Sequence, residues 1–261
     1  MPQISVYILT YNEEHKVGDA IKSARWADEV VVVDSNSTDS TVSIAETLGA
    51  RVVNVPFEGF GKLRNAAINA CTYEWIFSLD ADERCTTSSV KEIREILNSK
   101  DPSDAYFVPR RNYFMGKWIK YSGWHPDYRQ PQLFRKGSMV FWEGDEVHEG
   151  YDVSGRVGYL KNPIWQFPFR NLEQLQIKAN RYSSLGAEKL LRKGKKTGMA
   201  KALGHGLWTF IQIYILKMGF LDGWAGFMIA LGNFEGTFYR YSKLVEKQEG
   251  WENPPHEIPF N

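Results

Sequence analysis

The chain has 261 residues, 43% of them hydrophobic and 24% charged, which fits one globular domain or one domain with an extension. The formal net charge is +1 at pH 7, so no global electrostatic field attracts nucleic acid. Residues 1–3 lead directly into an apolar strand pattern without the regions of a secretory signal, and no apolar run reaches the roughly 18 residues that span a bilayer. We therefore expect a cytoplasmic protein in which Cys71 and Cys85 stay reduced.

Short apolar strands alternate with short amphipathic helices over the first hundred residues. The expected strands are 4–9, 29–33, 51–55 and 74–79, and the expected helices are 17–24, 42–48 and 62–70. A capping box at 89–92 predicts a further helix, with Ile93, Ile96 and Leu97 on one face. This alternation predicts right-handed βαβ units and a Rossmann-like α/β fold with a mostly parallel sheet flanked by helices.

The fourth expected strand ends abruptly in carboxylates. The apolar run at 75–79 leads directly into Asp80, Asp82 and Glu83. Like charges so close together cost free energy unless a cation or hydrogen-bond donors neutralise them. A divalent metal would do so, because Mg²⁺ typically takes one or two protein carboxylates together with substrate phosphates. A merely solvated acidic corner is the alternative, and the Asp-x-Asp spacing alone does not decide between the two.

Polar clusters follow three of the expected strands. They are Tyr11-Asn12-Glu13 after the first, Asp34-Ser35 after the second and Asp80-Ala81-Asp82 after the fourth. Ligands of open α/β sheets bind at the carboxyl ends of the strands, so this edge is the candidate nucleotide site. No G-x-G-x-x-G follows the first strand and no G-x-x-x-x-G-K-[ST] occurs. These absences argue against a dinucleotide-dependent dehydrogenase and a P-loop NTPase.

Four segments, in their order and spacing, resemble a family 2 glycosyltransferase of the GT-A fold. They are YNEE at 11–14, VVDSNSTD at 32–39, GFGKLRN at 59–65 and DADER at 80–84. Later segments resemble the lipopolysaccharide core β-1,4-glucosyltransferases, which add glucose from UDP-glucose to an inner-core heptose: PRRN at 109–112, SGWHPD at 122–127 and VHE at 147–149. The resemblance runs over nearly the whole chain. It implies an inverting hexosyltransferase that depends on Mg²⁺ or Mn²⁺.

The resemblance also implies where the uridine of a UDP-sugar donor binds. Thr10, Tyr11 and Asp34 are expected to hold it, and Ser35 stands where many relatives carry a second Asp. That departure leaves the uracil contact open. Glu13 is expected to fix the loop. For Tyr11 the alternative is an aromatic at the edge of the core whose hydroxyl faces water.

The diphosphate and the metal are expected nearby. Lys62 and Arg64 supply the donors that a phosphate requires, although a solvated helix face explains them equally well. Asp82 is the expected metal ligand, and Asp80 is expected to lie near the ribose or to share the metal. His148 is a further candidate ligand, with a structural hydrogen bond as the alternative.

A second acidic cluster is the expected source of the catalytic base. An inverting transfer needs a carboxylate that takes the proton of the acceptor hydroxyl. The resemblance places this base among Asp145, Glu146 and Glu149, and we favour Glu149. Four arginines could hold the diphosphate or an anionic acceptor, with structural ion pairs as the alternative. They are Arg110, Arg111, Arg129 and Arg135.

The chain changes character in its second half. No Asp or Glu occurs from Lys189 to Leu221, and apolar segments rich in Trp, Phe and Leu follow at 207–216 and 224–231. A basic block precedes them, formed by Lys189, Arg192, Lys193, Lys195, Lys196 and Lys201. We expect a catalytic GT-A domain over 1–165 and a helical region over 166–261, with an irregular tail from Glu246.

Basic residues beside aromatic and Leu-rich helices suit an interfacial element on an anionic leaflet. We therefore expect a peripheral enzyme on the cytoplasmic face of the inner membrane, where a lipid-linked glycan acceptor is presented. The alternative for this region is a helical subdomain that packs on the sheet or on a second subunit.

Two other functions compete with glycosyl transfer. A sugar-nucleotide nucleotidyltransferase shares the site at the strand ends, but it needs a Gly-rich loop with Arg or Lys after the first strand, and residues 10–13 do not provide one. A non-catalytic scaffold on the membrane surface would keep the fold. The retention of Asp80, Asp82 and the acidic segment at 145–149 speaks against it.

Overall fold

The computed structural model describes residues 2–143 and 150–251. The chain divides into two compact units. The first comprises Met1–Tyr113 and Pro126–Pro168, and the second comprises Phe114–His125 and Phe169–Asn261. The first unit contains all the strand ends at which polar clusters were expected.

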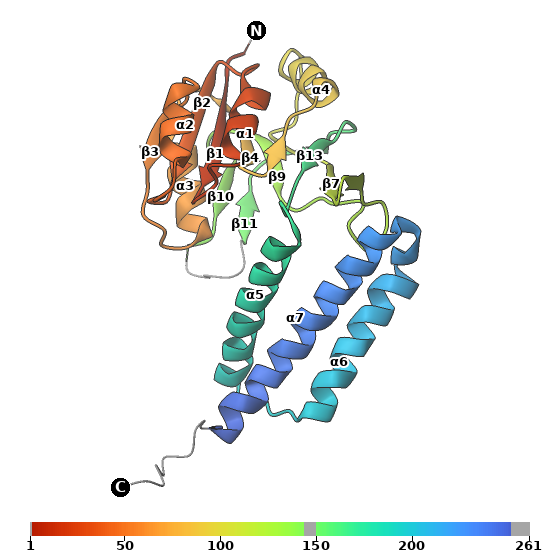
Figure 1. The fold of residues 1–261 in the computed structure, drawn as a ribbon. Coiled ribbons are helices and arrows are strands. Elements are labelled where there is room, and N and C mark those ends of the chain that lie inside the picture. The colour runs from red at the N-terminus through yellow and green to blue at the C-terminus, as the bar shows by residue number, and fades with distance from the viewer. Residues whose placement is uncertain (1, 144–149, 252–261) are drawn as a thin grey trace, which may run out of the picture. The chain divides into compact units, whose positions relative to one another are not determined.

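A seven-stranded sheet forms the centre of the first unit, in the order β12-β6-β9-β4-β1-β2-β3 (Figure 1). Its strands are β1 (Ile4–Thr10), β2 (Glu29–Asp34), β3 (Arg51–Asn54), β4 (Trp75–Asp80), β6 (Ala105–Phe107), β9 (Pro131–Arg135) and β12 (Val157–Tyr159). β1 runs parallel to β2 and β4, and β2 runs parallel to β3. β9 is antiparallel to both β4 and β6. The mostly parallel α/β sheet predicted from the sequence is confirmed.

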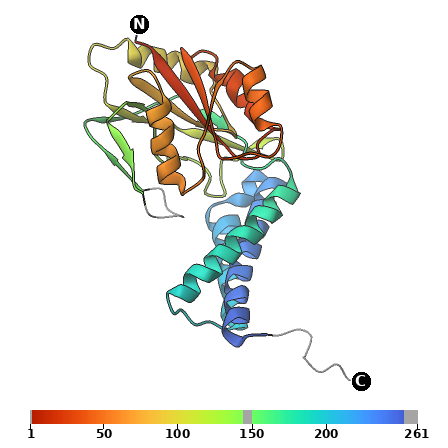
Figure 2. The same cartoon turned by 90° about the vertical axis from the view of Figure 1, so that its left-hand side faces the viewer.

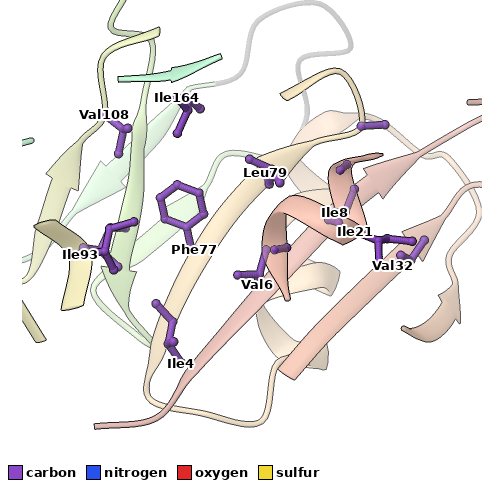
Figure 3. Close-up of a cluster of buried hydrophobic side chains, with 14 of the residues drawn as sticks. Ile4, Val6, Ile8, Ile21, Val32, Phe77, Leu79, Ile93, Val108 and Ile164 are labelled. Carbon is purple, nitrogen blue, oxygen red and sulfur yellow. The ribbon is translucent and has the colours of Figure 1, made fainter. Parts of the chain in front are cut away.

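Helices cover both faces of this sheet (Figures 1 and 2). They are α1 (Val17–Ala24), α2 (Thr41–Thr47), α3 (Phe60–Ala70) and α4 (Thr87–Leu97). Ile4, Val6 and Ile8 of β1 point into one core, to which α1, α2 and α4 contribute (Figure 3). Tyr7 and Leu9 point into the other core, to which α3 contributes. A strand buried on both faces reads as a continuous apolar run, which is why β1 shows no alternation in the sequence.

α4 begins one turn earlier than predicted. Its N-cap is Thr86, whose hydroxyl accepts a hydrogen bond from the Ser89 N–H (3.1 Å). Ser89 returns the bond by accepting from the Thr86 N–H (3.0 Å). Ser89 therefore fills the third helical position of the capping box, and the predicted box at 89–92 is wrong because the sequence offers two capping residues one turn apart.

Two small sheets complete the first unit. β13 (Ile164–Gln166) lies between β5 (Glu83–Arg84) and β7 (Arg110–Phe114), and β10 (Met139–Phe141) pairs with β11 (Tyr151–Val153). The register of β13 places Gln166 opposite both Glu83 and Asn112. Three polar side chains from distant parts of the sequence thus meet directly after the end of β4.

The second unit is helical. It contains β8 (Lys117–Trp118), α5 (Leu172–Arg192), α6 (Met199–Ile211), η1 (Gln212–Leu216), η2 (Gly219–Asp222) and α7 (Trp224–Glu249). α7 packs against both α5 and α6. α7 continues to Glu249, so the prediction that an irregular tail starts at Glu246 is wrong by a few residues. The prolines of the predicted tail lie outside the described residues. Within the described ranges, none of the helices has the length and apolar character needed to cross a membrane.

Glu29 ties the beginning of β2 to neighbouring elements. Its carboxylate accepts hydrogen bonds from Ser5, Arg51 and both the N–H and hydroxyl of Thr72. Burial raises the pKa of Glu29, but these bonds outweigh burial and lower the pKa to about 2. Since the folded pKa lies below the unfolded value, the ionised carboxylate stabilises the fold above the unfolded pKa of about 4.3, and this stabilisation is lost as the pH falls towards 2.

We therefore expect Glu29→Gln to lower the melting temperature at pH 7, and the difference from the wild type to shrink progressively between about pH 5 and pH 2. Thermal unfolding followed by circular dichroism measures this difference. Glu46→Gln, on the exposed surface of α2, is the matched control and should show no such dependence. A constant difference for Glu29→Gln across this range would contradict the role given to the carboxylate.

Candidate active site

The loops after β1 and β2 meet at a buried carboxylate. Asp34 accepts a hydrogen bond from the Thr10 hydroxyl (2.9 Å) and from the N–H (2.7 Å) and hydroxyl of Ser37. Thr10, Asp34 and Ser35 are buried, whereas Tyr11 is 57% exposed. The exposure of Tyr11 argues against the core-edge alternative. Asp34 therefore holds the loops after β1 and β2 together from inside the protein. The ring of Tyr11 lies on the surface of the loop after β1.

Both loops contain an asparagine with a left-handed backbone, Asn12 (φ 51°) and Asn36 (φ 61°). Such conformations are uncommon outside glycine and persist only where neighbouring groups hold them. The Asn12 side chain accepts from the Thr38 N–H (2.8 Å), and the Glu13 N–H donates to the Thr41 hydroxyl (2.8 Å). These bonds join the two loops into one rigid rim.

Asp80, at the end of β4, is paired with a buried arginine. Arg64 of α3 lies 3.3 Å from the Asp80 carboxylate and 3.2 Å from the Ser78 hydroxyl. Burial disfavours the ionised form of Asp80, but the guanidinium groups of Arg64, Arg110 and Arg129 outweigh burial and hold its pKa below the ordinary value. Asp80 is consequently a carboxylate throughout the neutral range.

The turn that carries Asp80 and Asp82 is fixed by Glu83. The Glu83 side chain is fully buried and accepts hydrogen bonds from the Asp80 N–H (3.0 Å), from Gln132 Nε2 (2.8 Å) and from Arg110 Nε. Burial raises the pKa of Glu83, and the charge of Arg110 opposes that rise. A carboxylate that binds a main-chain N–H three residues earlier closes the turn and orients the two aspartates before any ligand arrives.

Further main-chain contacts hold the same turn. Arg84 donates to the carbonyl oxygens of Ala81 (2.8 Å) and Lys16 (2.9 Å), and the Phe167 N–H donates to the carbonyl oxygen of Asp82 (2.8 Å). None of these bonds involves the carboxylate group of Asp80 or Asp82. The turn is therefore preorganised, which lowers the entropic cost of binding a ligand there.

The donor set at this turn suits a hard divalent cation. Asp82 is half-buried, and its carboxylate lies 3.5 Å from Gln166 Nε2. Among residues 2–143 and 150–251, no group of three or more His, Cys, Asp or Glu forms a metal site. Two carboxylates are nevertheless enough for Mg²⁺ or Mn²⁺, because such ions complete their shells with water and phosphate oxygens. The further candidate ligand, His148, lies outside the described residues.

The two residues predicted to donate hydrogen bonds to the phosphates, Lys62 and Arg64, lie in different environments. Lys62 is exposed and pairs with Glu58 (2.9 Å), whereas Arg64 is buried and reaches Asp80. The structure thus brings Arg64 to the aspartate turn and leaves Lys62 on the outer surface of α3, in the position that the solvated-face alternative described.

The four arginines predicted to bind anions also differ in position and burial. Arg110 is buried in an ion pair with Glu83, and Arg111 is half-buried on the same strand. Arg129 is exposed and contributes to the electrostatic field at Asp80. Arg135 is paired in register with Trp75 at the start of β4 and forms ion pairs with Glu74 and Asp104, as the alternative of structural ion pairs describes.

The predicted base segment, with Asp145, Glu146 and Glu149, lies outside the described residues. Its flanks are firmly placed. The Asn65 amide group bonds both the N–H and the carbonyl oxygen of Phe141 (2.9 Å each), and the Trp142 N–H donates to the Gly150 carbonyl oxygen (2.8 Å). A Cβ added to Gly61 would lie 2.0 Å from the Trp142 carbonyl oxygen. The flank before the segment is therefore anchored on α3, the helix that carries Arg64, and the flank after it is bonded to the first flank.

Sequence reasoning missed the buried polar residues beneath the turn. They are Glu83, Arg110 as its partner, Asn112, Gln132 and Gln166. The available signal was a glutamine next to apolar residues, at Gln132 before Leu133 and Gln166 before Phe167. A buried glutamine needs hydrogen-bond partners, so such a residue indicates a polar assembly in the core.

Comparisons with known proteins agree with this geometry. The family model described as Glycosyl transferase family 2 matches residues 5–160. An uncharacterised glycosyltransferase of Rickettsia typhi is 31% identical, covering 94% of this chain and 88% of the relative. The lipopolysaccharide core biosynthesis glycosyltransferase LpsC of Rhizobium meliloti is 27% identical, covering 94% of this chain and 92% of the relative.

Solved structures bear out the fold. TarS 1–349 of S. aureus, crystallised with UDP, covers 98% of this chain and 94% of its own, with a TM-score of 0.50 and 17% identity. A likeness at this identity concerns the fold alone. The family match, which spans more than half of the chain and includes the turn at Asp80 and Asp82, establishes that the chain belongs to glycosyl transferase family 2.

Proposed function

We propose that the protein is an inverting, metal-dependent glycosyltransferase that moves glucose from UDP-glucose to an inner-core heptose of lipopolysaccharide. The observation that carries the proposal is the preorganised turn of Asp80 and Asp82 beside buried Arg64, at the carboxyl edge of a parallel sheet. The relative LpsC supports a lipopolysaccharide acceptor by its name, and the UDP in the TarS crystal supports a uridine nucleotide donor. The acceptor would be lipid-linked and reached at the cytoplasmic face of the inner membrane.

The donor would bind along the rim formed by the two loops. Thr10 and Asp34 would position the uridine, with the exposed ring of Tyr11 beside the base. The guanidinium of Arg64, 3.3 Å from the Asp80 carboxylate, would add positive charge where the diphosphate would bind. Asp82, with Asp80 and His148, would hold Mg²⁺ or Mn²⁺, and the bound ion would supply positive charge that neutralises the leaving diphosphate.

The acceptor hydroxyl must lose its proton as it attacks the anomeric carbon, and we propose Glu149 as the base. The anchoring of Phe141 and Trp142 to α3 supports a base from the segment 145–149, because it ties the residues before that segment to the helix of Arg64. Removal of a general base typically costs about 10² to 10⁴ in rate, so Glu149→Gln should lower turnover by that factor and spare donor binding. Asp145→Asn is the matched comparison, and a larger loss there would move the assignment to Asp145.

One incubation separates this proposal from its competitors. The protein is mixed with UDP-glucose, Mg²⁺ and a heptose acceptor, with and without added pyrophosphate, and the products are analysed by mass spectrometry. Free UDP with a glucosylated heptose supports transfer. Pyrophosphate-dependent formation of UTP supports the nucleotidyltransferase. Absence of product across a panel of sugar nucleotides and acceptors supports the non-catalytic scaffold.

A further inference from the structure

α6 is apolar on two sides, and α7 covers one of them. Ala202 and Gly206 are buried, and a Cβ added to Gly206 would lie 3.0 Å from the Phe234 ring of α7. The other side carries Leu203, Leu207 and Ile211, four residues apart and therefore in line along the helix. A line of large apolar side chains along a helix is normally covered, so this exposed side indicates a partner.

The exposed side continues beyond α6 into a longer surface, which we call the apolar ridge. Its members are Leu203, Leu207, Trp208, Ile211, Ile215, Leu216, Met218, Phe220, Leu221 and Trp224. Each of these side chains is between 43% and 75% exposed. They belong to consecutive elements of the helical unit, from α6 through η1 and η2 to the first residue of α7. The ridge is thus a continuous edge and not a scatter of single apolar residues.

Positive charge accompanies the ridge. The turn between α5 and α6 contains Lys193, Lys195 and Lys196, all exposed, and no Asp or Glu occurs from Lys189 to Leu221. The first acidic residue after this stretch, Asp222, is buried and accepts hydrogen bonds from the main-chain N–H groups of Lys120 (3.0 Å) and Tyr121 (3.1 Å). Among the described residues from Lys189 to Trp224 no Asp or Glu is exposed, whereas the end of α7, where Gln248 donates to the Lys195 carbonyl oxygen (2.6 Å), carries the exposed Glu246 and Glu249.

We propose that the apolar ridge docks on the surface of an anionic lipid bilayer, with its apolar side chains at the acyl boundary and the basic turn on the headgroups. Exposed apolar side chains beside clustered lysines are the features of helices that lie in a membrane interface. The ridge of a second copy would offer apolar side chains but, from Lys189 to Trp224, no exposed carboxylate for the basic turn, whereas anionic lipid offers acyl chains and negative charge together. The choice of lipid also rests on the proposed lipid-linked acceptor.

Co-sedimentation of the full chain with vesicles tests the proposal without nucleotide or acceptor. The protein should sediment with vesicles of phosphatidylcholine and phosphatidylglycerol and at least about tenfold more weakly with phosphatidylcholine alone. Leu207→Glu with Trp208→Glu should lower binding by about tenfold or more, because two large apolar side chains no longer enter the bilayer. Lys195→Gln with Lys196→Gln should lower only the anionic-lipid binding by a similar factor.

Ile177→Glu is the matched control, because Ile177 is 61% exposed on α5 and lies outside the ridge; its binding should equal that of the wild type. Failure of the wild type to bind anionic vesicles, or unchanged binding by the Leu207/Trp208 variant, would overturn the proposal. So would a wild-type dimer that this variant converts to a monomer without any vesicle binding. Transfer to a soluble heptose acceptor, measured separately, shows whether the catalytic proposal stands independently.

Discussion

Asp82→Ala is expected to abolish glycosyl transfer and metal-dependent donor binding while leaving the fold intact. The turn should survive, because its main chain is held by the bond from Phe167 to the Asp82 carbonyl oxygen and by Glu83 on the Asp80 N–H. What disappears is a carboxylate ligand for the cation that neutralises the leaving diphosphate. Charge stabilisation by a bound metal is worth several kcal/mol, so turnover should fall by about 10³-fold or more.

Three measurements check this expectation. UDP release gives the turnover, calorimetric titration with UDP-glucose in the presence and absence of Mn²⁺ gives donor binding, and thermal unfolding gives the stability. Asp101→Ala removes an exposed carboxylate that pairs with Arg156 and should leave activity unchanged. Full activity of Asp82→Ala, or of the wild type in excess chelator, would exclude a metal at this turn from the reaction.

The parts of the fold that local sequence determines were predictable. β1, β2 and β4 are predominantly apolar because both faces of the sheet are covered, and each ends in polar residues at the same edge. α1 places Val17, Ala20, Ile21 and Ala24 inward at helical spacing, as the sequence predicts. Thr10, Asp34 and Asp80 could be assigned to one edge for this reason, since strand direction and strand ends are local properties.

The assembly beneath the turn was not predictable, because its contacts are long-range. Glu83 meets Arg110, 27 residues away, and Gln132, 49 residues away. Neither partner follows from an apolar pattern, since two of the three buried positions of β7 are the polar residues Arg110 and Asn112, and Gln132 is a buried polar residue among the apolar residues of β9. The position of Arg135 was not predictable for the same reason, because its place beside the start of β4 depends on the antiparallel register of β9.

Arg110→Met should strongly destabilise the first unit. The Glu83–Arg110 pair is almost completely buried, and removal of one partner of such a pair leaves an uncompensated charge that costs about 3 to 5 kcal/mol. The second substitution Glu83→Gln should restore most of that loss, because no buried charge then remains. Urea denaturation measures the free energy of unfolding of the single variant, the double variant and the control that follows. Arg156→Met, which breaks a fully exposed pair with Asp101, should leave the stability almost unchanged, because water screens such pairs.

The pH dependence of Arg110→Met identifies the buried charge as the cause. Burial already raises the pKa of Glu83 beside Arg110, and without the opposing guanidinium the folded pKa must rise further above the unfolded value. A raised folded pKa means that the folded state binds the proton more tightly, so stability is greatest below the unfolded pKa and is lost as the pH rises towards the folded pKa. The deficit of Arg110→Met should consequently be smaller at pH 5 than at pH 8. An equal deficit at both values would mean that lost packing, and not the stranded carboxylate, destabilises the variant.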